Sequence, residues 1–252
     1  MGAIARKGVI LAGGAGTRLK PLTYFTNKHL IRVFDKMMVL FPLATLKDIG
    51  ASDICLVTGY NYVEKFRRAL GNGKKYGVSL TYRSQDAPRG LAHAVLQAED
   101  FSKGHKVAVI LGDDFFGRVK VPEKAFNDKY AYVCVNRALD PAKVAIVEFD
   151  TKGNIVGIEE KPKKPKSDFE ICGLYIYPPD VFNFIKKLKP SKRGELEITD
   201  VNKWYLKRGL LRPIKIDSLI ADGGNFKSLA KLWTLRIKQL VTRSKYMDKS
   251  IA

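Results

Sequence analysis

A glycine-rich stretch with two nearby cations is the strongest candidate for phosphate chemistry. It runs Leu11-Ala12-Gly13-Gly14-Ala15-Gly16-Thr17-Arg18, directly after an apolar segment. Glycines let backbone N–H groups approach an anion closely, and Arg18 with Lys28 would neutralise phosphate oxygens beside them. The stretch is not a P-loop, because no Lys-Ser/Thr follows its last glycine, and it lacks the third glycine of the dinucleotide fingerprint. A plain tight turn is the alternative explanation.

Carboxylates at two positions are candidate ligands for a divalent cation. Asp113 and Asp114 follow the apolar run Val107–Leu111, and Asp222 precedes Gly223-Gly224. Acidic side chains at the carboxyl end of a buried strand are well placed to hold Mg²⁺ against a nucleotide. Each also fits an ordinary turn capped by Asp, so neither position decides the matter alone.

Two later segments combine charges that would suit a second anion. The first is Ile158-Glu159-Glu160-Lys161-Pro162 at the end of a β-rich run, which taken alone fits a solvated strand end. The second is Arg193-Gly194-Glu195-Leu196-Glu197-Ile198-Thr199-Asp200, whose charges would also serve as helix caps and surface pairs. The three histidines, at 29, 93 and 105, share no spacing, so core or surface roles are favoured over ligation.

The first half of the chain must position the glycine-rich stretch and the first aspartates. Apolar runs at 9–11, 54–58, 78–82 and 107–111 predict strands, and segments at 37–49, 62–70 and 91–99 predict helices between them. This alternation predicts parallel strands joined by crossover helices, and therefore a three-layer α/β domain.

After Gly117 the pattern becomes β-rich and then helical. Strands are predicted at 130–136, 144–149, 155–159, 169–177 and 211–216, and helices at 123–128, 180–188, 198–207 and from Phe226 to about Tyr246. No repeat or low-complexity linker interrupts the chain. We therefore expect one domain over 1–252, with halves at 8–117 and 118–225 and a closing helix at 226–252.

The charge balance points to anionic partners without identifying them. The chain has 45 Lys+Arg against 25 Asp+Glu in 252 residues, a formal net charge of +20. Such a charge suits nucleic acid, an anionic surface or phosphorylated small molecules. The lysines are dispersed, and aromatic residues are not interleaved with the densest runs, so nucleic acid is the least favoured partner. Steep salt dependence of duplex affinity would be its sign.

Apolar stretches and cysteines indicate the compartment. The longest uncharged apolar stretch, Met37–Leu46, has ten residues, against about 20 for a membrane span, so no membrane partner is expected. No secretory signal core develops after Arg6 and Lys7. The three cysteines, 55, 134 and 172, lie in apolar runs without metal-ligand spacing, which predicts reduced core residues in a cytoplasmic protein.

In this order, the motifs resemble the sugar-1-phosphate nucleotidylyltransferases, and among them the glucose-1-phosphate thymidylyltransferases. The family opening GGxGTRLxPxT stands here at 13–23, followed by Lys28. Further matches are QDAPRGLAHA at 85–94, Gly112-Asp113, Glu159–Pro162, Gly173-Leu174-Tyr175 and RGELEITD at 193–200. The resemblance covers about residues 8 to 230. It implies a three-layer, Rossmann-like nucleotide-diphospho-sugar transferase fold with a mixed, mostly parallel central sheet.

The resemblance also implies an activity and a site. A sugar 1-phosphate, expected to be glucose 1-phosphate, would attack the α-phosphate of dTTP or UTP with Mg²⁺ bound, giving a nucleotide-sugar and pyrophosphate. Arg18, Lys28, Asp113 and Lys161 would be the catalytic residues, and Asp113 with Asp222 would hold the metal. The nucleotide would contact Leu11, Ala12, Gly13, Gly14, Gly16, Thr17, Arg18, Lys28, Gln85, Pro88, Gly90 and Asp113. The sugar phosphate would contact Asp114, Ala145, Glu160, Lys161, Ile171, Gly173 and Arg193.

Several positions depart from the family pattern. His29 stands where the family has Gln, Arg32 where it has Pro, Asp114 where it has Asn, and Val144-Ala145 where it has Tyr-Gly. These departures leave a catalytically weak or inactive sugar-nucleotide-binding regulatory paralogue as the alternative. The chain also stops soon after the last predicted helix, where longer relatives have further helices for oligomer contacts and feedback control. We therefore expect no feedback inhibition and leave homo-oligomer formation open.

Overall fold

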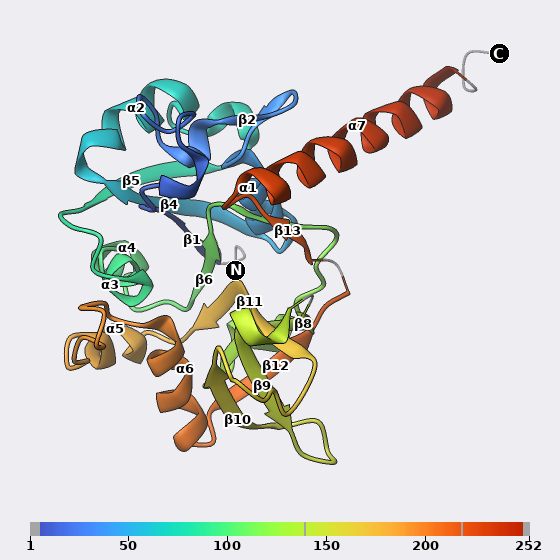
Figure 1. The fold of residues 1–252 in the computed structure, drawn as a ribbon. Coiled ribbons are helices and arrows are strands. Elements are labelled where there is room, and N and C mark those ends of the chain that lie inside the picture. Colours follow the sequence, from blue (N-terminus) through green and yellow to red (C-terminus); the bar gives the residue numbers. More distant parts are fainter. Residues whose placement is uncertain (1–5, 139, 218, 249–252) are drawn as a thin grey trace.

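A nine-stranded sheet forms the centre of the protein, as seen in the computed structural model, which describes residues 6–138, 140–217 and 219–248 (Figure 1). Along one path the strands run β10-β9-β11-β6-β1-β4-β5, with β8 joining at β11 and β12 at β8. The neighbours β6, β1, β4 and β5 are parallel, whereas β11 is antiparallel to β6, β8 and β9. Their bounds are β1 (Arg6–Ala12), β4 (Ala51–Gly59), β5 (Ser79–Gln85), β6 (Val107–Leu111), β8 (Ala131–Arg137), β9 (Ala145–Phe149), β10 (Ile155–Glu160), β11 (Phe169–Tyr177) and β12 (Leu211–Lys215).

Helices cover both faces of this sheet, because the apolar side chains of its strands alternate between two cores. Val9 and Leu11 of β1 belong to one apolar cluster, and Ile10 and Ala12 to the other. The first cluster is closed by α3 (Leu91–Leu96), α4 (Glu99–Ser102), α5 (Asp180–Ile185) and α6 (Ile198–Lys207). The second is closed by α1 (Leu40–Asp48) and α2 (Val63–Leu70). The expected three-layer α/β fold with a mixed sheet is therefore confirmed.

Most predicted elements are present, with differences at the ends and among the shortest strands. The predicted helix at 91–99 is divided into α3 and α4, and the segment at 123–128 forms only a 3-10 turn, Glu123–Phe126. Four short strands had no sequence signal, because two to four residues carry too little alternation: β2 (Arg32–Val33), β3 (Lys36–Met37), β7 (Asp114–Phe116) and β13 (Leu219–Asp222). The β7–β13 pair is the important addition, because it brings the two aspartate segments together.

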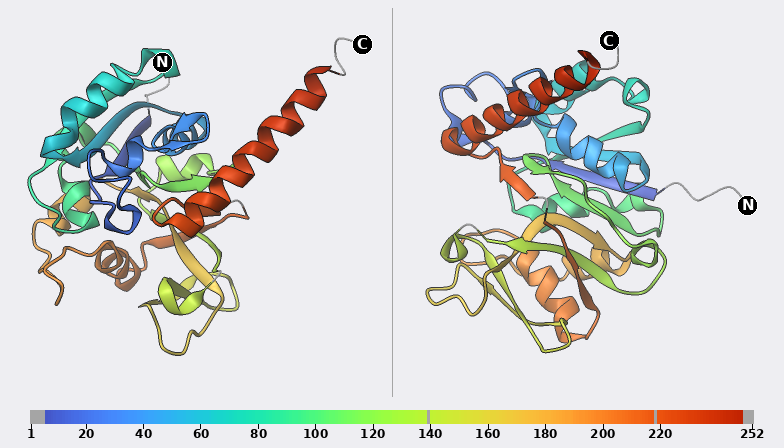
Figure 2. Two further views of the ribbon diagram at one scale, coloured as in Figure 1. Left: turned by 45° about the horizontal axis from the view of Figure 1, so that its top comes forward. Right: turned by 90° about the vertical axis from the view of Figure 1, so that its right-hand side faces the viewer.

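The chain closes with a long helix, α7 (Phe226–Asp248), which leaves the body of the molecule (Figures 1 and 2). Its first turns are anchored by Leu229 and Leu232, which are buried with Leu19, Val33, Met38 and Phe115. Among the described residues, no helix combines the length and apolar character that crossing a bilayer requires. All three cysteines are free and buried, as predicted.

Candidate active site

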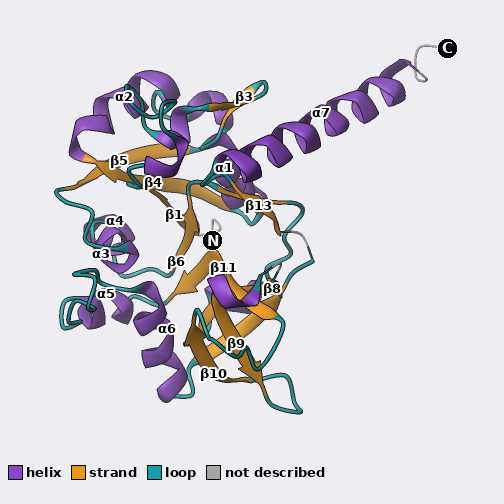
Figure 3. Ribbon diagram, viewed as in Figure 1, coloured by secondary structure: helices purple, strands orange, loops and turns teal. Residues whose placement is uncertain are grey.

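The carboxyl ends of the parallel strands border a cavity of about 390 Å³. The glycines of the glycine-rich stretch follow β1, Gln85 ends β5, and Asp113 follows β6. Figure 3 shows these strands within the central sheet. Ligands of open α/β sheets bind at this edge. Eight of the predicted nucleotide-site residues line the cavity: Leu11, Gly13, Gly14, Lys28, Gln85, Pro88, Gly90 and Asp113. Ala12, Gly16, Thr17 and Arg18 belong to the same glycine-rich stretch but are not among the residues that line the cavity.

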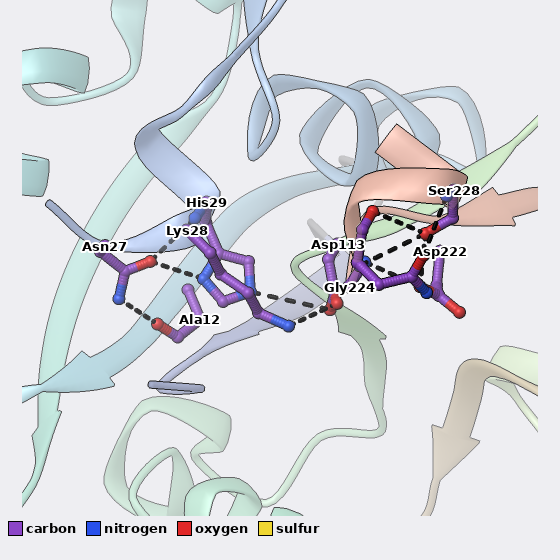
Figure 4. Close-up of polar contacts among 9 residues, drawn as sticks. Ala12, Asn27, Lys28, His29, Asp113, Asp222, Gly224 and Ser228 are labelled. Atoms are coloured by element: carbon purple, nitrogen blue, oxygen red, sulfur yellow. Dashed lines mark hydrogen bonds and ion pairs between the residues drawn. The ribbon is translucent and has the colours of Figure 1, made fainter. Parts of the chain in front are cut away.

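Two neighbouring side chains, Lys28 and His29, hold the Asp113 carboxylate in this cavity (Figure 4). Its Oδ2 forms an ion pair with the Lys28 ammonium, and its Oδ1 lies 3.7 Å from Nε2 of His29. Asn27 orients that histidine. The Asn27 Oδ1 accepts a hydrogen bond from the His29 backbone N–H at 2.9 Å and lies 2.6 Å from the His29 ring Nδ1. The Asn27 Nδ2 donates to the Ala12 carbonyl at 3.0 Å. His29 thus belongs to the site, although the sequence analysis gave it no such role.

The surroundings of Asp113 favour an anion beside a neutral imidazole. Burial of Asp113 opposes ionisation, but His29 and the charge of Lys28 outweigh it and hold the pKa of this carboxyl well below its usual range. Burial lowers the pKa of His29. At neutral pH the cavity therefore offers a fixed carboxylate and a fixed ammonium group within one ion pair.

Asp222 and Arg18 meet Asp113 beside Gly224. Asp222 Oδ1 accepts hydrogen bonds from Gly224 N at 2.7 Å and from the Ser228 hydroxyl at 3.3 Å (Figure 4). A Cβ atom on Gly224 would lie 2.9 Å from both Asp222 Oδ1 and Arg18 Nη2, and 3.5 Å from Asp113 Oδ2. The Gly223 N–H donates to the Asp113 carbonyl at 2.7 Å, which fixes the two segments to each other. Two residues more than 100 positions apart in sequence thus direct carboxylate oxygens to one place.

A second cavity, of about 400 Å³, contains three of the predicted sugar-phosphate residues: Glu160, Lys161 and Arg193. Pairing of β10 with β9 sets Glu160 opposite Ala145, and the Lys161 N–H donates to the Val144 carbonyl at 3.0 Å. Lys161 has φ +48°, a conformation that is rare for residues with a side chain and is found at functional sites. Glu160 accepts from the Thr199 hydroxyl at 2.8 Å.

Asp114 is buried beneath the site instead of lining either cavity. Its Oδ2 accepts the Gly173 N–H at 3.0 Å, and burial, with the charges of Asp113 and Asp222 nearby, raises the pKa of this carboxyl well above its usual range. The raised pKa favours the protonated carboxyl, which both donates and accepts hydrogen bonds, as the amide of the family's Asn does. Ala145, Ile171 and Gly173 likewise do not appear among the residues that line these two cavities.

One segment joins the two cavities. Leu196 N donates to the Arg89 carbonyl at 2.8 Å, and Ala92 N donates to the Leu196 carbonyl at 3.1 Å. On either side of Leu196, Glu195 lines the nucleotide-side cavity and Glu197 lines the other. Glu197 also holds Arg193, whose Nη2 and Nε lie 2.8 and 3.2 Å from its Oε1. The motif at 193–200 contained Glu195, but only the fold shows which cavity it faces.

Glu170 of β11 is a carboxylate that the sequence analysis did not single out. Burial, together with the charge of Asp222, raises its pKa to about 7 from an ordinary value of 4.5. A raised pKa means that ionisation of Glu170 lowers the free energy of unfolding. This loss of stability is absent below pH 4.5, where the carboxyl is protonated in both states, and fully present above pH 7.

We therefore expect Glu170→Gln to be more stable than the parent protein at pH 8 and to lose that advantage at pH 4.5 and below. Urea unfolding in EDTA at several pH values measures the difference. Glu148→Gln, which alters a carboxylate on the adjacent strand β9, is the control and should show no such trend. An equal stability difference at all pH values for Glu170→Gln would contradict the assignment.

Known proteins with this sequence pattern and fold share one family. Residues 7–236 match the family model described as nucleotidyl transferase. A glucose-1-phosphate thymidylyltransferase of Neisseria gonorrhoeae is 43% identical over 209 residues, covering 81% of this chain and 73% of its own. The corresponding protein of Mycolicibacterium smegmatis is 41% identical over 232 residues, covering 88% and 79%.

Solved structures agree with this family. A Bacillus anthracis protein described as a glucose-1-phosphate thymidylyltransferase, in complex with sucrose, superposes with a TM-score of 0.86 at 42% identity, covering 92% of this chain and 95% of that one. A UDP-glucose pyrophosphorylase complexed with UDP-glucose shares the fold, with a TM-score of 0.82 at 23% identity, covering 94% of this chain and 100% of that one. The chain belongs to the nucleotidyl transferase family and is a sugar-1-phosphate nucleotidylyltransferase of the glucose-1-phosphate thymidylyltransferase-like type.

Proposed function

We propose that the protein uses glucose 1-phosphate and dTTP, with UTP as the alternative nucleotide, and that it requires Mg²⁺. The observation that carries this proposal is the convergence of Arg18, Asp113 and Asp222 beside Gly224, with Lys28 paired to Asp113. Two cations and two carboxylates at one place suit a metal-bound triphosphate. The cations would neutralise phosphate oxygens, and the carboxylates would bind the metal. The names of the relatives above support glucose 1-phosphate and a thymidine nucleotide.

The half at 8–117 is proposed to bind the nucleotide. The loop of Gly13 and Gly14 would supply backbone donors to the phosphates, and Arg18 with Lys28 would neutralise them. Gln85, Pro88 and Gly90 also line this cavity, and the base would lie against them. Glu195 reaches this cavity from the opposite half and would face the nucleoside.

The half at 118–225 is proposed to bind the sugar phosphate. Lys161 and Arg193 would grip its phosphate from two sides of the second cavity. Glu160, held by the Thr199 hydroxyl, would accept hydrogen bonds from the sugar hydroxyls. Asp114, Ala145, Ile171 and Gly173 would support this half from around and beneath it, with Asp114 fixing β11 through the Gly173 N–H.

The carboxylates of this chain fit Mg²⁺. Among the described residues, no group of three or more His, Cys, Asp or Glu side chains could hold a metal ion by itself. A pair of carboxylates, however, is the usual protein share of an Mg²⁺ site whose other ligands are water and substrate phosphate oxygens. Asp113 and Asp222 would be that pair, and bound Mg²⁺ would neutralise charge on the phosphates.

The protein's contribution to the reaction is positioning and electrostatic. A phosphate oxygen of the sugar phosphate attacks the α-phosphorus, the bond from that phosphorus to the bridging oxygen breaks, and pyrophosphate leaves with the electron pair. Lys161 and Arg193 would hold the attacking phosphate in line, while Arg18 and Lys28 would stabilise charge on the leaving group. Neither step requires a covalent enzyme intermediate.

A matrix of substrates tests this proposal. Four or five hexose 1-phosphates are combined with dTTP, UTP, CTP, ATP and GTP, with and without Mg²⁺, and pyrophosphate release is measured. We expect the highest kcat/KM for glucose 1-phosphate with dTTP or UTP, and no turnover in EDTA. Nucleotide binding without turnover for every pair would instead identify a regulatory paralogue.

The three buried free cysteines favour work in a reducing compartment such as the cytoplasm.

A further inference from the structure

His93 of helix α3 lies behind Gln85, a residue of the nucleotide-side cavity. The ring Nδ1 of His93 is 2.9 Å from Gln85 Nε2, and the His93 side chain is 12% exposed. Gln85 lines the cavity, whereas His93 is not among its lining residues. The spacing of the histidines in the sequence favoured a core or surface role for each of them. The place of His93 gives it a different one, because it can act on a bound nucleotide through Gln85.

The Gly90 carbonyl fixes the direction of the Gln85 side-chain amide. Gln85 Nε2 lies 3.3 Å from the Gly90 carbonyl oxygen, which can only accept a hydrogen bond. That oxygen also accepts the Ala94 N–H at 3.2 Å, at the start of α3, so it cannot turn away. The other end of the amide, Oε1, points to the glycine loop, where a Cβ atom on Gly13 would lie 2.8 Å from it. Gly13 and Gln85 both line the cavity, so the amide directs its acceptor toward the nucleotide side.

The contacts of the His93 ring assign its proton to Nε2. This nitrogen faces Asp86 Oδ1 at 3.7 Å, which favours an N–H there. Gln97 Nε2 also approaches it, at 3.4 Å, but donates to the His93 backbone carbonyl at 3.1 Å. With the proton on Nε2, the lone pair of Nδ1 faces Gln85 and accepts its N–H. Each N–H of the Gln85 amide then has an acceptor of its own.

Burial favours the neutral form of this ring. It lowers the pKa of His93 from its usual 6.5, against the charge of Asp86, and the charge of Arg89 adds to the lowering. Arg89 also pairs with Asp86, with Nη2 2.7 Å from Oδ2, so this carboxylate is shared between the two cations. At neutral pH Nδ1 is therefore an acceptor. A protonated ring would turn an N–H toward the N–H of Gln85, and two donors would face each other.

We propose that His93 is a positioning residue that selects the base of the nucleotide through Gln85. Thymine and uracil present an N3–H donor between two carbonyl oxygens, whereas cytosine presents N3 as an acceptor beside an amino group. An amide held with Oε1 forward would accept the N3–H of thymine or uracil and would meet a lone pair on cytosine. A polar group left without a partner in a closed site is what rejects the wrong ligand. The inference rests on the proposed nucleotide site and adds a selecting residue outside the cavity.

A matched pair of nucleotides isolates this effect. dTTP and 5-methyl-dCTP have the same sugar, methyl group and triphosphate, and differ only at N3 and the substituent of C4. Titration calorimetry with Mg²⁺ and without sugar phosphate gives both dissociation constants, and their ratio is the base preference. Contributions of the triphosphate, and of His29 beside Asp113, are common to both nucleotides and cancel in this ratio. We expect the parent protein to prefer dTTP by at least about 100-fold at pH 8.

Two variants of His93 separate its hydrogen bond from its bulk. His93→Leu keeps an apolar side chain of similar size but has no acceptor, so the Gln85 amide could turn, and the preference should fall about tenfold. His93→Asn places its Oδ1 near the position of Nδ1 and should retain most of the preference. His105→Asn alters an exposed histidine outside both cavities and should leave the ratio unchanged. Circular dichroism checks the fold of each variant.

Acid should reproduce the effect of the leucine variant in the parent protein. As the pH falls from 8 to about 5.5, protonation of His93 removes the acceptor for the Gln85 N–H, so the preference for dTTP should fall. The fall should lie below pH 6.5, because burial lowers the pKa of His93 from that value. His93→Asn has no titrating group at this place, so its ratio keeps only the trend of the bases themselves. The difference between the two curves belongs to His93.

Three results would overturn the proposal while leaving the proposed function intact. The first is a His93→Leu protein that keeps the full preference for dTTP. The second is a His93→Leu protein that binds both nucleotides more weakly by the same factor, which would show a purely structural role. The third is an identical pH profile of the preference in the parent protein and in His93→Asn. Failure of every nucleoside triphosphate to bind would instead refute the proposed nucleotide site, and this inference with it.

Discussion

Replacing Asp113 by Asn is expected to lower kcat/KM about a thousandfold while the protein remains folded. The Asp113 carboxylate forms an ion pair with Lys28 and lies within reach of the point where Asp222 and Arg18 also converge. Asn has nearly the same shape but no charge, so it would neither attract a divalent cation nor hold Lys28 in place. Pyrophosphate release across a range of Mg²⁺ concentrations measures the effect, with circular dichroism to check the fold.

The control for this variant is Asp53→Asn. Asp53 also pairs with a lysine, Lys7, at 2.8 Å, but it lies outside both cavities. Its loss should leave kcat/KM within a fewfold of the parent protein. If Asp113→Asn were as active as Asp53→Asn, neither the metal assignment nor the role of the Lys28 pair would survive.

Gly90→Ala should weaken the binding of both substrates, even though Gly90 lines only the nucleotide cavity. Gly90 has φ +98° and ψ 170°, a region open almost only to glycine, and an added Cβ would lie 2.5 Å from the Leu196 carbonyl oxygen. The chain would have to separate at Arg89–Leu196, the contact that joins the two cavities. We expect a stability loss of about 2 kcal/mol and at least a tenfold rise in Kd for dTTP and in KM for glucose 1-phosphate.

Gly59→Ala is the matched control for the glycine change. Gly59 has φ −64°, and a Cβ there would meet only the Tyr62 ring at 3.6 Å, an ordinary contact. It should cost little stability. Titration calorimetry with dTTP and steady-state kinetics provide the two readouts. A Gly90→Ala protein that lost nucleotide affinity but kept its KM for the sugar phosphate would show that the Leu196 contact does not link the two sides.

The fold was largely predictable because the central strands are long and buried on both faces. Runs such as Val107–Leu111 are uniformly apolar, and the helices between them keep one apolar face, as Phe66 and Leu70 of α2 show. The pair β7–β13 could not be predicted, since its strands are short and include charged residues. Yet that pair sets Asp114 opposite Asp222, so a tertiary contact without a periodic signal builds part of the site.

Motifs in the sequence predicted much of the candidate site, and they missed the residues that only the fold brings to it. Sequence motifs identified Gly13, Gly14, Lys28, Gln85, Asp113, Lys161 and Arg193, and each of these residues lines one of the two cavities. No motif gave His29 or Glu195 a role in the site. The contact with Asn27 orients the His29 ring in the site. The backbone hydrogen bonds of Leu196 with Arg89 and Ala92 fix the segment that carries Glu195. The raised pKa of Asp114 is likewise caused by burial, which a local sequence does not reveal.

The most direct test of the central claim is a crystal structure with dTTP and Mn²⁺ in place of Mg²⁺. Anomalous scattering from Mn²⁺ locates the metal without ambiguity. The account predicts one manganese peak between the carboxylates of Asp113 and Asp222, on phosphate oxygens that also contact Arg18 and Lys28. Manganese bound elsewhere, or a triphosphate from which Arg18 and Lys28 both point away, would contradict it.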